Sequence, residues 1–294
     1  MIVASFGWGT AGVATRVVLE EGVTPYHLAS YRSLLAVLAV LVFLLIRRRG
    51  LPRGGVVWRV GLVMGLSNLA VPFIFSNIAL QYAGAGFLGL MTALIPVMTA
   101  GIAHFTLPEE RLSIMKTAGL VVGLLGVAVL MLSGDSGLAE GGRPLVAGLL
   151  GFGAVASISA GSIFAKSHAG EYEPLDVTGV HFGSGMVVVL VATLAVEGGP
   201  VGETALAWSV LVYMALVGTV LPMVLYYWML QRVTATYASL AGYVIPLIAV
   251  AAGVLVLDEQ LQPGILAGGA VILVGVLLAD RAEHRTVSTG IALG

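Results

Sequence analysis

The sequence VGLVMGLSNLAVPFIFSNIALQYAGAGFLGLMTALIPVMTAGIAHFTLP runs from Val60 to Pro108 without a charged residue. A helix that crosses the hydrocarbon core of a bilayer needs about 20 apolar residues, so this stretch is too long for a single span. It turns briefly polar and small at 81–84, where it reads Gln-Tyr-Ala-Gly. The stretch therefore predicts two consecutive membrane-spanning helices, at about 57–80 and 84–106.

The rest of the chain has the same character. Of its 294 residues, 59% are hydrophobic and only 10% are charged, whereas soluble domains have about 25% charged residues. Charged and turn residues divide the remainder into eight further spans, at about 2–19, 28–46, 114–133, 145–165, 176–196, 206–229, 233–256 and 263–280. Backbone groups in hydrocarbon must be hydrogen-bonded within the segment, and the alternating pattern of barrel strands is missing. The predicted fold class is an all-α membrane protein with ten transmembrane helices.

The basic residues predict the orientation in the membrane. With a cytoplasmic N-terminus, Arg143 alone lies on the outer side, and the cytoplasmic connections hold eleven basic residues: Arg47, Arg48, Arg49, Arg53, Arg59, Arg111, Lys116, Lys166, Arg232, Arg281 and Arg285. Because Lys and Arg favour the cytoplasmic side, we expect a multi-pass protein of the cell (inner or plasma) membrane with both termini in the cytoplasm. No basic residue precedes Arg16, which indicates that the first span is a retained helix rather than a signal peptide.

An internal repeat relates the two halves of the sequence. At a shift of 150 residues, Pro72 falls on Pro222, and Ile95-Pro96 falls on Ile245-Pro246. At a shift of 149, matches include Pro25 with Pro174, Gly119 with Gly268 and Gly126 with Gly275. Five spans per copy is an odd number, so the second copy must be inserted upside down, and such inverted repeats are typical of secondary transporters. We expect a first repeat at 1–134, a linker at 135–144, a second, inverted repeat at 145–281 and a cytoplasmic tail at 282–294.

Several short motifs resemble a known family. They are Phe6-Gly7-Trp8-Gly9 in the first span, the basic Arg16, Pro25 with Arg32 in the second span, and the Ile-Pro pairs followed by an acidic residue and a Gly-x6-Gly helix. This pattern is similar to that of EamA-type proteins of the drug/metabolite transporter superfamily. The resemblance implies that spans one to four and six to nine surround a central cavity, while spans five and ten support the bundle. It also implies a transporter that favours export.

Four matched prolines are candidate hinges. A proline inside a membrane helix removes one backbone hydrogen bond and bends the helix. Pro72 and Pro96 in the first half, with Pro222 and Pro246 in the second, give each half two helices that can flex. Static kinks that shape the packing are the alternative, and the symmetry of the four favours hinges.

Two intramembrane basic positions are candidates for ligand contact. Arg32 lies about one turn into its span, where it can bind an anionic group or extend towards the headgroups. His181 occupies the equivalent place in the second copy. Arg16 has Glu20 four residues further on, which favours an ordinary helical ion pair.

The polar residues within spans predict a substrate site. Asn68, Pro72 and Ser76 recur every four residues and so share one face of an α-helix, and Pro222 and Tyr226 form the equivalent face in the copy. Each such residue alone fits helix packing as well as ligand binding. As a set, the predicted substrate-binding residues are Trp8, Arg32, Asn68, Ser76, Thr92, Ser159, His181, Tyr226, Tyr227 and Tyr237.

The distribution of charged residues along the sequence restricts the class of transported substrate. No acidic residue falls in the middle of a predicted span, so proton coupling by a buried carboxylate is not expected, and His104 and His181 remain as titratable candidates. A cluster of basic residues for a phosphorylated substrate is also missing. The sequence favours a neutral or zwitterionic metabolite such as an amino acid.

Partners and cofactors are restricted in the same way. A net charge of −1 does not indicate nucleic acid, and the absence of cysteine excludes thiolate metal sites. We expect a small-molecule substrate, the lipid bilayer, no cofactor and no metal, and a chain that can work as a monomer.

Two other functions are compatible with parts of the sequence. His181 and Ser184 faintly resemble the site of an intramembrane serine hydrolase, although a nucleophile and its base normally come from separate elements. A passive channel is the third option, and its transport would not saturate with substrate.

Overall fold

The computed structural model describes residues 1–46, 50, 52, 54–79, 82, 91–132, 144–199, 202–257 and 263–291. Most of the predicted division at 81–84 and of the predicted linker at 135–144 falls outside these residues. Within them, all regular secondary structure is helical. Six helices are long and apolar enough to cross a membrane, and four more are shorter apolar helices. The predicted all-α membrane fold is confirmed.

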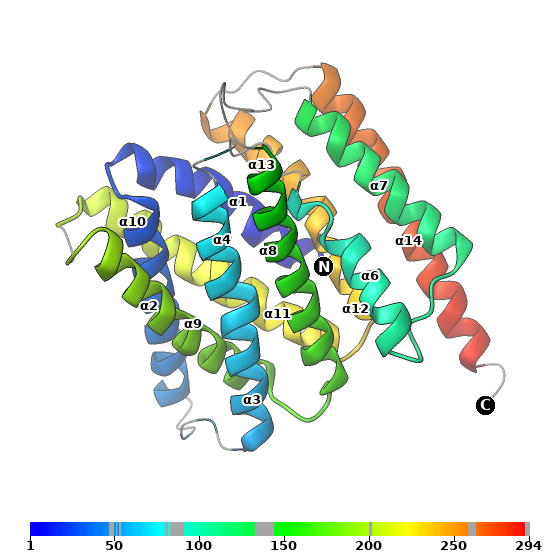
Figure 1. The fold of residues 1–294 in the computed structure, drawn as a ribbon, viewed down its shortest axis with the longest axis horizontal. Helices are drawn as coiled ribbons and strands as arrows, with labels where there is room; N and C mark the ends of the chain where they lie inside the picture. The colour runs from blue at the N-terminus through cyan, green and yellow to red at the C-terminus, as the bar shows by residue number, and fades with distance from the viewer. Residues whose placement is uncertain are drawn as a thin grey trace.

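The helices follow the predicted spans closely. Those of the first half are α1 (Ile2–Glu20), α2 (Pro25–Ile46), α3 (Gly55–Met64), the π-helix η1 (Gly65–Ala70), α4 (Val71–Ala79), α6 (Ile95–Thr106) and α7 (Ile114–Leu132). Those of the second half are α8 (Pro144–Ser167), α9 (Pro174–Val196), α10 (Ala205–Ala215), the π-helix η2 (Leu216–Val220), α11 (Leu221–Leu230), α12 (Ala235–Ser239), α13 (Ala241–Leu257) and α14 (Pro263–Ile291). Figure 1 shows their arrangement.

The predicted helix ends differ from the observed ones for physical reasons. α2 and α9 begin at Pro25 and Pro174, two to three residues earlier than predicted from hydropathy. Proline suits the first helical turn because its missing N–H would be unpaired there in any case. α14 continues to Ile291, past the predicted end at residue 280. Hydropathy marks where the chain leaves the hydrocarbon, and a helix can continue into water.

Three of the four matched prolines lie within two residues of an interruption of their helix, and the fourth, Pro246, lies inside α13, six residues after a turn. The π-helix η1 ends just before Pro72, and the π-helix η2 ends just before Pro222. A turn at 93–94 precedes Pro96, and a turn at Leu240 separates α12 from α13, which contains Pro246. Proline cannot donate to the carbonyl four residues back and its ring crowds that carbonyl, so the helix widens or breaks there.

The two repeats are interleaved rather than side by side. In the first half, α1 packs on α10, α11 and α13, while α2 packs on α9 and α10. α3 and η1 contact α9 and α8, and α6 contacts α8 and α12. Most of the helix packing therefore joins one repeat to the other. We call the end of the bundle where α1 ends and α2 begins the Thr24 end, and the end where α11 meets α12 the Glu110 end.

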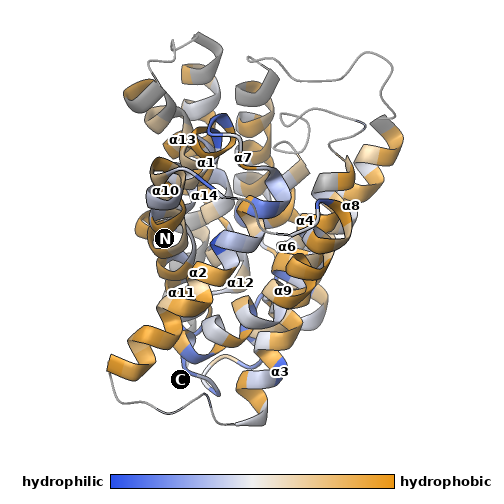
Figure 2. Ribbon diagram, turned by 90° about the vertical axis from the view of Figure 1, so that its left-hand side faces the viewer, coloured by the Kyte–Doolittle hydropathy of each residue, from blue (hydrophilic) through white to orange (hydrophobic). Residues whose placement is uncertain are grey.

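The outer surface of the bundle is apolar. Leu45 and Ile46 on α2, Phe105 on α6 and Leu145 on α8 each expose more than two thirds of their surface. Hydrophobic residues cover most of the helical length (Figure 2). Such a surface is solvated by lipid, because exposing it to water would cost about 25 cal/mol per Å².

The helices α7 and α14 form a pair at one edge of the bundle (Figure 1). Their backbones approach closely through glycines: a Cβ added at Gly275 would lie 2.3 Å from the Gly123 nitrogen, and one at Gly126 would lie 2.5 Å from the Ile272 nitrogen. Small residues at helix interfaces permit this approach in membranes. The pair occupies the supporting place that the family resemblance implies for spans five and ten.

A side chain at Gly275 must separate this pair. We expect Gly275→Val to destabilise the protein by about 1–3 kcal/mol, because its Cβ meets backbone atoms that cannot move alone. Thermal unfolding in detergent should show a lower midpoint by several degrees. Gly12→Val on α1, where an added Cβ meets nothing within 4 Å, is the matched control. Equal midpoints for the two variants would contradict the close packing of α7 and α14.

Candidate functional site

A cavity of about 490 Å³ lies in the interior of the bundle. Its walls come from both repeats, with Trp8 on α1, Arg32 on α2, Asn68 on η1, His181 on α9 and Thr219 on η2. A second hollow of about 220 Å³ shares Trp8, Asn68 and Met223 with the first and is further lined by residues of α6, α8, α11, α12 and α13. The two hollows are therefore neighbouring chambers of one central space, and four of the predicted site residues line the larger one.

The Gly7-Trp8-Gly9 motif explains how Trp8 reaches this space. A Cβ added at Gly7 would lie 2.5 Å from the Pro222 ring, and one at Gly9 would lie 2.7 Å from the Ile248 side chain. In a helix, residues two apart point to nearly opposite sides. The two glycines thus let α1 fit between η2–α11 on one side and α13 on the other, and Trp8 between them lines both chambers.

Arg32 joins the second span to the broken eighth span. Its Nε donates to the Thr219 hydroxyl, and its Nη2 donates to the Gly218 carbonyl at 2.7 Å. Gly218 is four residues before Pro222, so its carbonyl cannot receive an N–H from that proline. The guanidinium supplies a hydrogen bond there. Both of these acceptors are neutral, and they use two of the five guanidinium N–H groups.

His181 is fixed by the aromatic residues around it. Its Nδ1 is 3.0 Å from the Tyr227 hydroxyl, and its ring stacks on Phe182 with centroids 4.6 Å apart. The Nε2 atom is buried, and no described residue forms a hydrogen bond with it. Ser184 donates instead to the backbone carbonyls of Gly61 and His181. The geometry therefore gives Ser184 no base, and the hydrolase alternative has no structural support.

The π-helix η1 changes which residues of the third span face the cavity. A regular α-helix would place Asn68, Pro72 and Ser76 on one face. In the structure, Asn68 and Phe73 line the larger chamber, five residues apart, because a π-turn contains more residues than an α-turn. The amide of Asn68 also donates to the Ile158 carbonyl at 3.2 Å, which ties this broken segment to α8.

The other predicted residues lie in different surroundings. Tyr226 lines the smaller chamber. Ser159 is fully buried and accepts a hydrogen bond from Thr99, and Tyr227 is fully buried beside His181. Ser76, Thr92 and Tyr237 are not among the lining residues of these two chambers. His104 accepts the Leu112 N–H at the turn after α6, which is a structural contact.

Several lining residues were not predicted from the sequence: Phe73, Phe182, Ser239, Thr219 and Met223. Phe73, Phe182 and Met223 are apolar, so a search for intramembrane polar residues passes over them. Thr219 and Ser239 were detectable as hydroxyls within spans, as were many others that only pack. Their membership of the site depends on the helix rotation, which the sequence does not specify.

Polar contacts join the helix ends at the Glu110 end of the bundle. Glu110, 2% exposed, accepts the backbone N–H groups of Ala235 at 2.6 Å and Thr236 at 3.2 Å, which begin α12. Lys166 donates to the Leu230 and Val233 carbonyls at 2.8 and 2.6 Å, where α11 ends. These contacts satisfy helix-end groups that would otherwise be unpaired. They join the loops of both repeats around the turn between α11 and α12.

A series of aromatic rings lies between this end and the cavity. Trp8 meets Tyr226 edge-on with centroids 5.9 Å apart, Tyr226 meets Tyr227, and Tyr227 meets Tyr172 at 5.8 Å. Burial raises the pKa of the Tyr172 phenol, in the loop before α9, well above its usual value, and the neighbouring Tyr226 raises it further. The rings belong to a buried apolar cluster that includes Val60, Met64 and Leu230. These rings and this cluster lie between the cavity and the Glu110 end, while the lining of the cavity reaches Leu19 and Pro25 near the Thr24 end.

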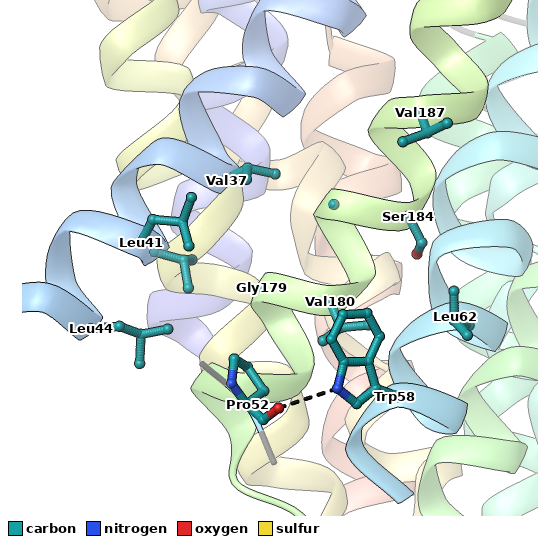
Figure 3. A pocket seen from close by; sticks show the side chains of 12 residues that line it. Val37, Leu41, Leu44, Pro52, Trp58, Leu62, Gly179, Val180, Ser184 and Val187 are labelled. Atoms are coloured by element: carbon teal, nitrogen blue, oxygen red, sulfur yellow. Dashed lines mark hydrogen bonds between the residues drawn. The ribbon is translucent and has the colours of Figure 1, made fainter. Parts of the chain in front are cut away.

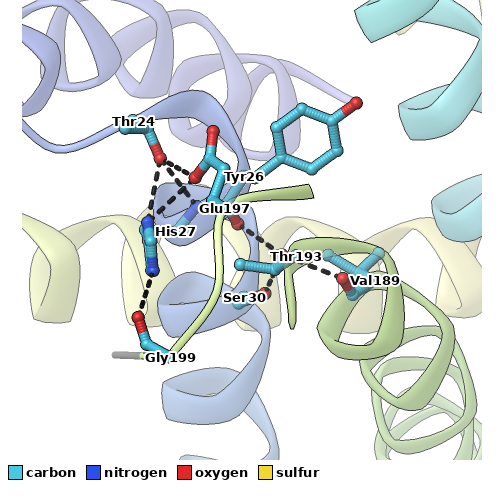
Figure 4. Close-up of polar contacts among 8 residues, drawn as sticks. All are labelled: Thr24, Tyr26, His27, Ser30, Val189, Thr193, Glu197 and Gly199. Atoms are coloured by element: carbon cyan, nitrogen blue, oxygen red, sulfur yellow. Dashed lines mark hydrogen bonds and ion pairs between the residues drawn. The ribbon is translucent and has the colours of Figure 1, made fainter. Parts of the chain in front are cut away.

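The Thr24 end has its own link between the repeats (Figure 4). The Nδ1 atom of His27 is 2.9 Å from the Glu197 carboxylate, and its Nε2 is 3.1 Å from the Gly199 carbonyl. Thr24 donates to the same carboxylate. Ser30 and Thr193 form a further hydrogen bond at 2.7 Å one turn deeper. These contacts hold the start of α2 against the end of α9.

A separate hollow of about 350 Å³ lies on the outer face of the bundle (Figure 3). It is lined by apolar side chains of α2, α3 and α9, including Leu41, Leu62 and Val187, which are partly exposed on the lipid-facing surface. The Trp58 indole donates to the Pro52 carbonyl at 3.2 Å at its rim. This hollow belongs to the lipid-facing surface and does not reach the central chambers.

An apolar bundle of two repeats with a partly polar cavity between them is the architecture of a membrane carrier. The model of the EamA-like transporter family matches residues 1–132 and 145–279. The chain belongs to this family, within the drug/metabolite transporter superfamily. It is thus a transporter and not an enzyme, and it acts in a bilayer on a small-molecule substrate.

Named relatives and a solved structure are similar over almost the whole chain. The uncharacterized transporter YoaV of Bacillus subtilis (strain 168) is 25% identical, with 92% of each chain covered. A chloroplastic WAT1-related protein of Arabidopsis thaliana is 27% identical over 95% of this chain and 68% of its own. One solved crystal structure has a TM-score of 0.81 at 20% identity and covers 97% of this chain and 96% of its own, which shows a common fold.

Removal of the Glu110 carboxylate should destabilise the contacts at the Glu110 end of the bundle. In Glu110→Ala, two buried N–H groups at the start of α12 lose their acceptor, which we expect to cost about 1–3 kcal/mol. The measurement is thermal unfolding in detergent. Glu109→Ala, one residue away and exposed, is the matched control and should leave the midpoint unchanged. A Glu110→Ala protein as stable as the control would show that this cap is dispensable.

Proposed function

We propose that this protein is a secondary transporter that exports a small neutral or zwitterionic metabolite by alternating access. The observation that supports this most directly is a cavity between two repeats whose walls include both π-helices, each followed within two residues by a matched proline. A cavity separated from the Glu110 end by packed side chains and lined towards the Thr24 end fits one state of an alternating-access cycle. We also propose that 1–134 and 145–281 are the repeats, that both termini and the Glu110 end are cytoplasmic, and that the plasma membrane is the site of action.

The interleaved packing suggests where the movement occurs. Rocking of one whole repeat against the other would break most of the helix contacts at once, because those contacts join the repeats. Bending at the interruptions before Pro72, Pro96 and Pro222, and at Pro246 within α13, would move half-helices while each end remains packed. The contacts at Glu110 and the link at His27 would then open in alternation.

The cargo would sit between Trp8, Arg32, Asn68, His181 and Tyr226, which line the two chambers. The larger chamber has the volume of a site for a metabolite, since such pockets usually enclose about 300–1,000 Å³. Its walls are mostly apolar with a few polar groups, which suits an amphipathic molecule.

Transport can be tested with purified protein in proteoliposomes. We expect saturable exchange of at least one labelled compound from a panel of amino acids and other small metabolites. Flux that rises linearly with concentration would support a passive channel instead. Absence of protein-dependent flux for the whole panel would contradict the proposal.

Access to the cavity can be tested with single cysteines, because the natural chain has none. We introduce Thr15→Cys in the larger chamber and Ser239→Cys in the smaller one. Because the two chambers form one central space, alternating access predicts that both positions are labelled faster by an impermeant thiol reagent added on the Thr24 side than on the Glu110 side. A transported substrate should change the ratio of the two rates. Equal rates from both sides at both positions, unchanged by any substrate of the panel, would contradict alternating access.

The hinge role predicts a specific kinetic defect. Pro222→Ala restores an N–H that can bond the Gly218 carbonyl, so the eighth span should become straighter and stiffer. We expect a several-fold lower maximal exchange rate with little change in half-saturating concentration. Pro174→Ala at the start of α9 is the matched control, because a proline there interrupts no helix. Normal exchange by Pro222→Ala would assign that proline a static role.

A further inference from the structure

The larger chamber contains a positive charge without a fixed counter-charge. Among the described residues that line it, Arg32 is the single formally charged one. Its hydrogen bonds go to Thr219 and to the Gly218 carbonyl, which are neutral acceptors. Arg32 is half-buried, and a partly buried charge is stabilised when an opposite charge pairs with it. The cavity is therefore complementary to an anionic group.

The unused donors of Arg32 suit a carboxylate. Three guanidinium N–H groups remain after the two hydrogen bonds to η2. The planar guanidinium matches the two oxygens of a carboxylate, and such charged pairs are stronger than neutral hydrogen bonds. The contacts with Thr219 and Gly218 hold the group in place, so binding of an anion needs little further ordering of the side chain.

His181 provides an independent observation. It lies 149 residues after Arg32, at the equivalent place of the second repeat, and lines the same chamber. It is 1% exposed, and its Nε2 is buried without a partner among the described residues. A phenol is a better donor than acceptor, so we assign the Tyr227 hydroxyl as donor to Nδ1. The proton of the neutral imidazole then lies on Nε2, a second donor for which no described residue provides an acceptor. Because this atom is buried, it meets a ligand only when the side chains around it move.

We propose that Arg32 and His181 together bind the carboxylate group of the transported molecule. This inference rests on the proposed function and gives its substrate a carboxylate. The class then consists of zwitterionic amino acids and small amphipathic monocarboxylates, and the latter are anions rather than neutral molecules. Trp8, Phe73 and Phe182 supply apolar walls for the rest of the molecule. An unpaired ammonium group of an amino acid would meet no carboxylate among the described lining residues, so the acid group determines recognition.

The experiment compares acids with their amides, which keep the shape and remove the charge. The probes are hexanoate, phenylacetate, indole-3-acetate and phenylalanine, each with its primary amide. Binding to the full chain in lipid nanodiscs is measured by isothermal titration calorimetry. We expect at least one acid to bind about tenfold or more tightly than its amide, the difference that a charged hydrogen bond produces.

The variants assign this selectivity to the two residues. Arg32→Gln should remove the preference for the acid, while Arg32→Lys, which keeps the charge, should retain part of it. His181→Phe should reduce the preference for the acid over the amide. The isosteric Tyr227→Phe tests the assignment of the Tyr227 hydroxyl as the donor to Nδ1 of His181. Arg232→Gln removes an exposed arginine that lies over the Trp228 ring, outside the cavity, and should leave binding unchanged. A purely structural role of Arg32 would lower the stability of the variant without altering the acid-to-amide ratio.

Several outcomes would overturn this inference. They are amides that bind as tightly as their acids, no binding of any acid at about 10 mM, or an Arg32→Gln protein that keeps the full preference. Saturable proteoliposome flux of a compound without a carboxylate would also overturn it, while the proposed transport function would stand. Tight, Arg32-dependent binding of an acid without any flux would instead overturn the transport proposal and leave the binding site intact.

Discussion

Every backbone N–H and C=O in the hydrocarbon core must find a hydrogen-bond partner within the protein, and the rest of this structure depends on how that constraint is met. Regular helices satisfy it, which is why the described chain is helical throughout its regular structure. The four matched prolines disturb it at equivalent places in both repeats. At Pro222, the affected Gly218 carbonyl receives the Arg32 guanidinium. The need to satisfy one carbonyl thus places a cation in the wall of the central cavity.

Close approach of helices is the second feature on which the site depends. Gly7 and Gly9 let α1 enter between the broken eighth span and α13, and Gly61 and Gly65 bring α3 and η1 against α9 at Val180 and Ser184. Lipid provides no hydrophobic driving force for helices to associate, so dispersion contacts between closely fitting surfaces hold them together. The glycines permit this close fit. The same contacts interleave the two repeats, so that Trp8, Arg32 and His181 line one cavity although they are far apart in the sequence.

The two ends of the bundle are held by different chemistry. At the Glu110 end, a carboxylate caps the first N–H groups of α12 and Lys166 caps the last carbonyls of α11, beside a large apolar cluster. At the Thr24 end, a His–Glu pair and a hydrogen bond between two hydroxyls join the start of α2 to the end of α9, and His27, Ser30 and Thr193 are buried there. Both ends therefore satisfy buried polar groups by contacts between the repeats, one through helix caps and the other through side chains.

The sequence by itself determined the membrane environment, the helical fold class and the repeat, because the apolar length of each span and the matched prolines are local or periodic properties. It also indicated Trp8, Arg32, Asn68 and His181, since polar or aromatic residues within spans are few. The tertiary structure alone decided which of the candidates share a cavity: Phe73 rather than Pro72 lies beside Asn68 because a π-turn rotates the helix, and Ser159 is bonded within the packing instead. Hydropathy records that a residue lies within a span, but the direction of its side chain depends on helix rotation and on the contacts of neighbouring helices.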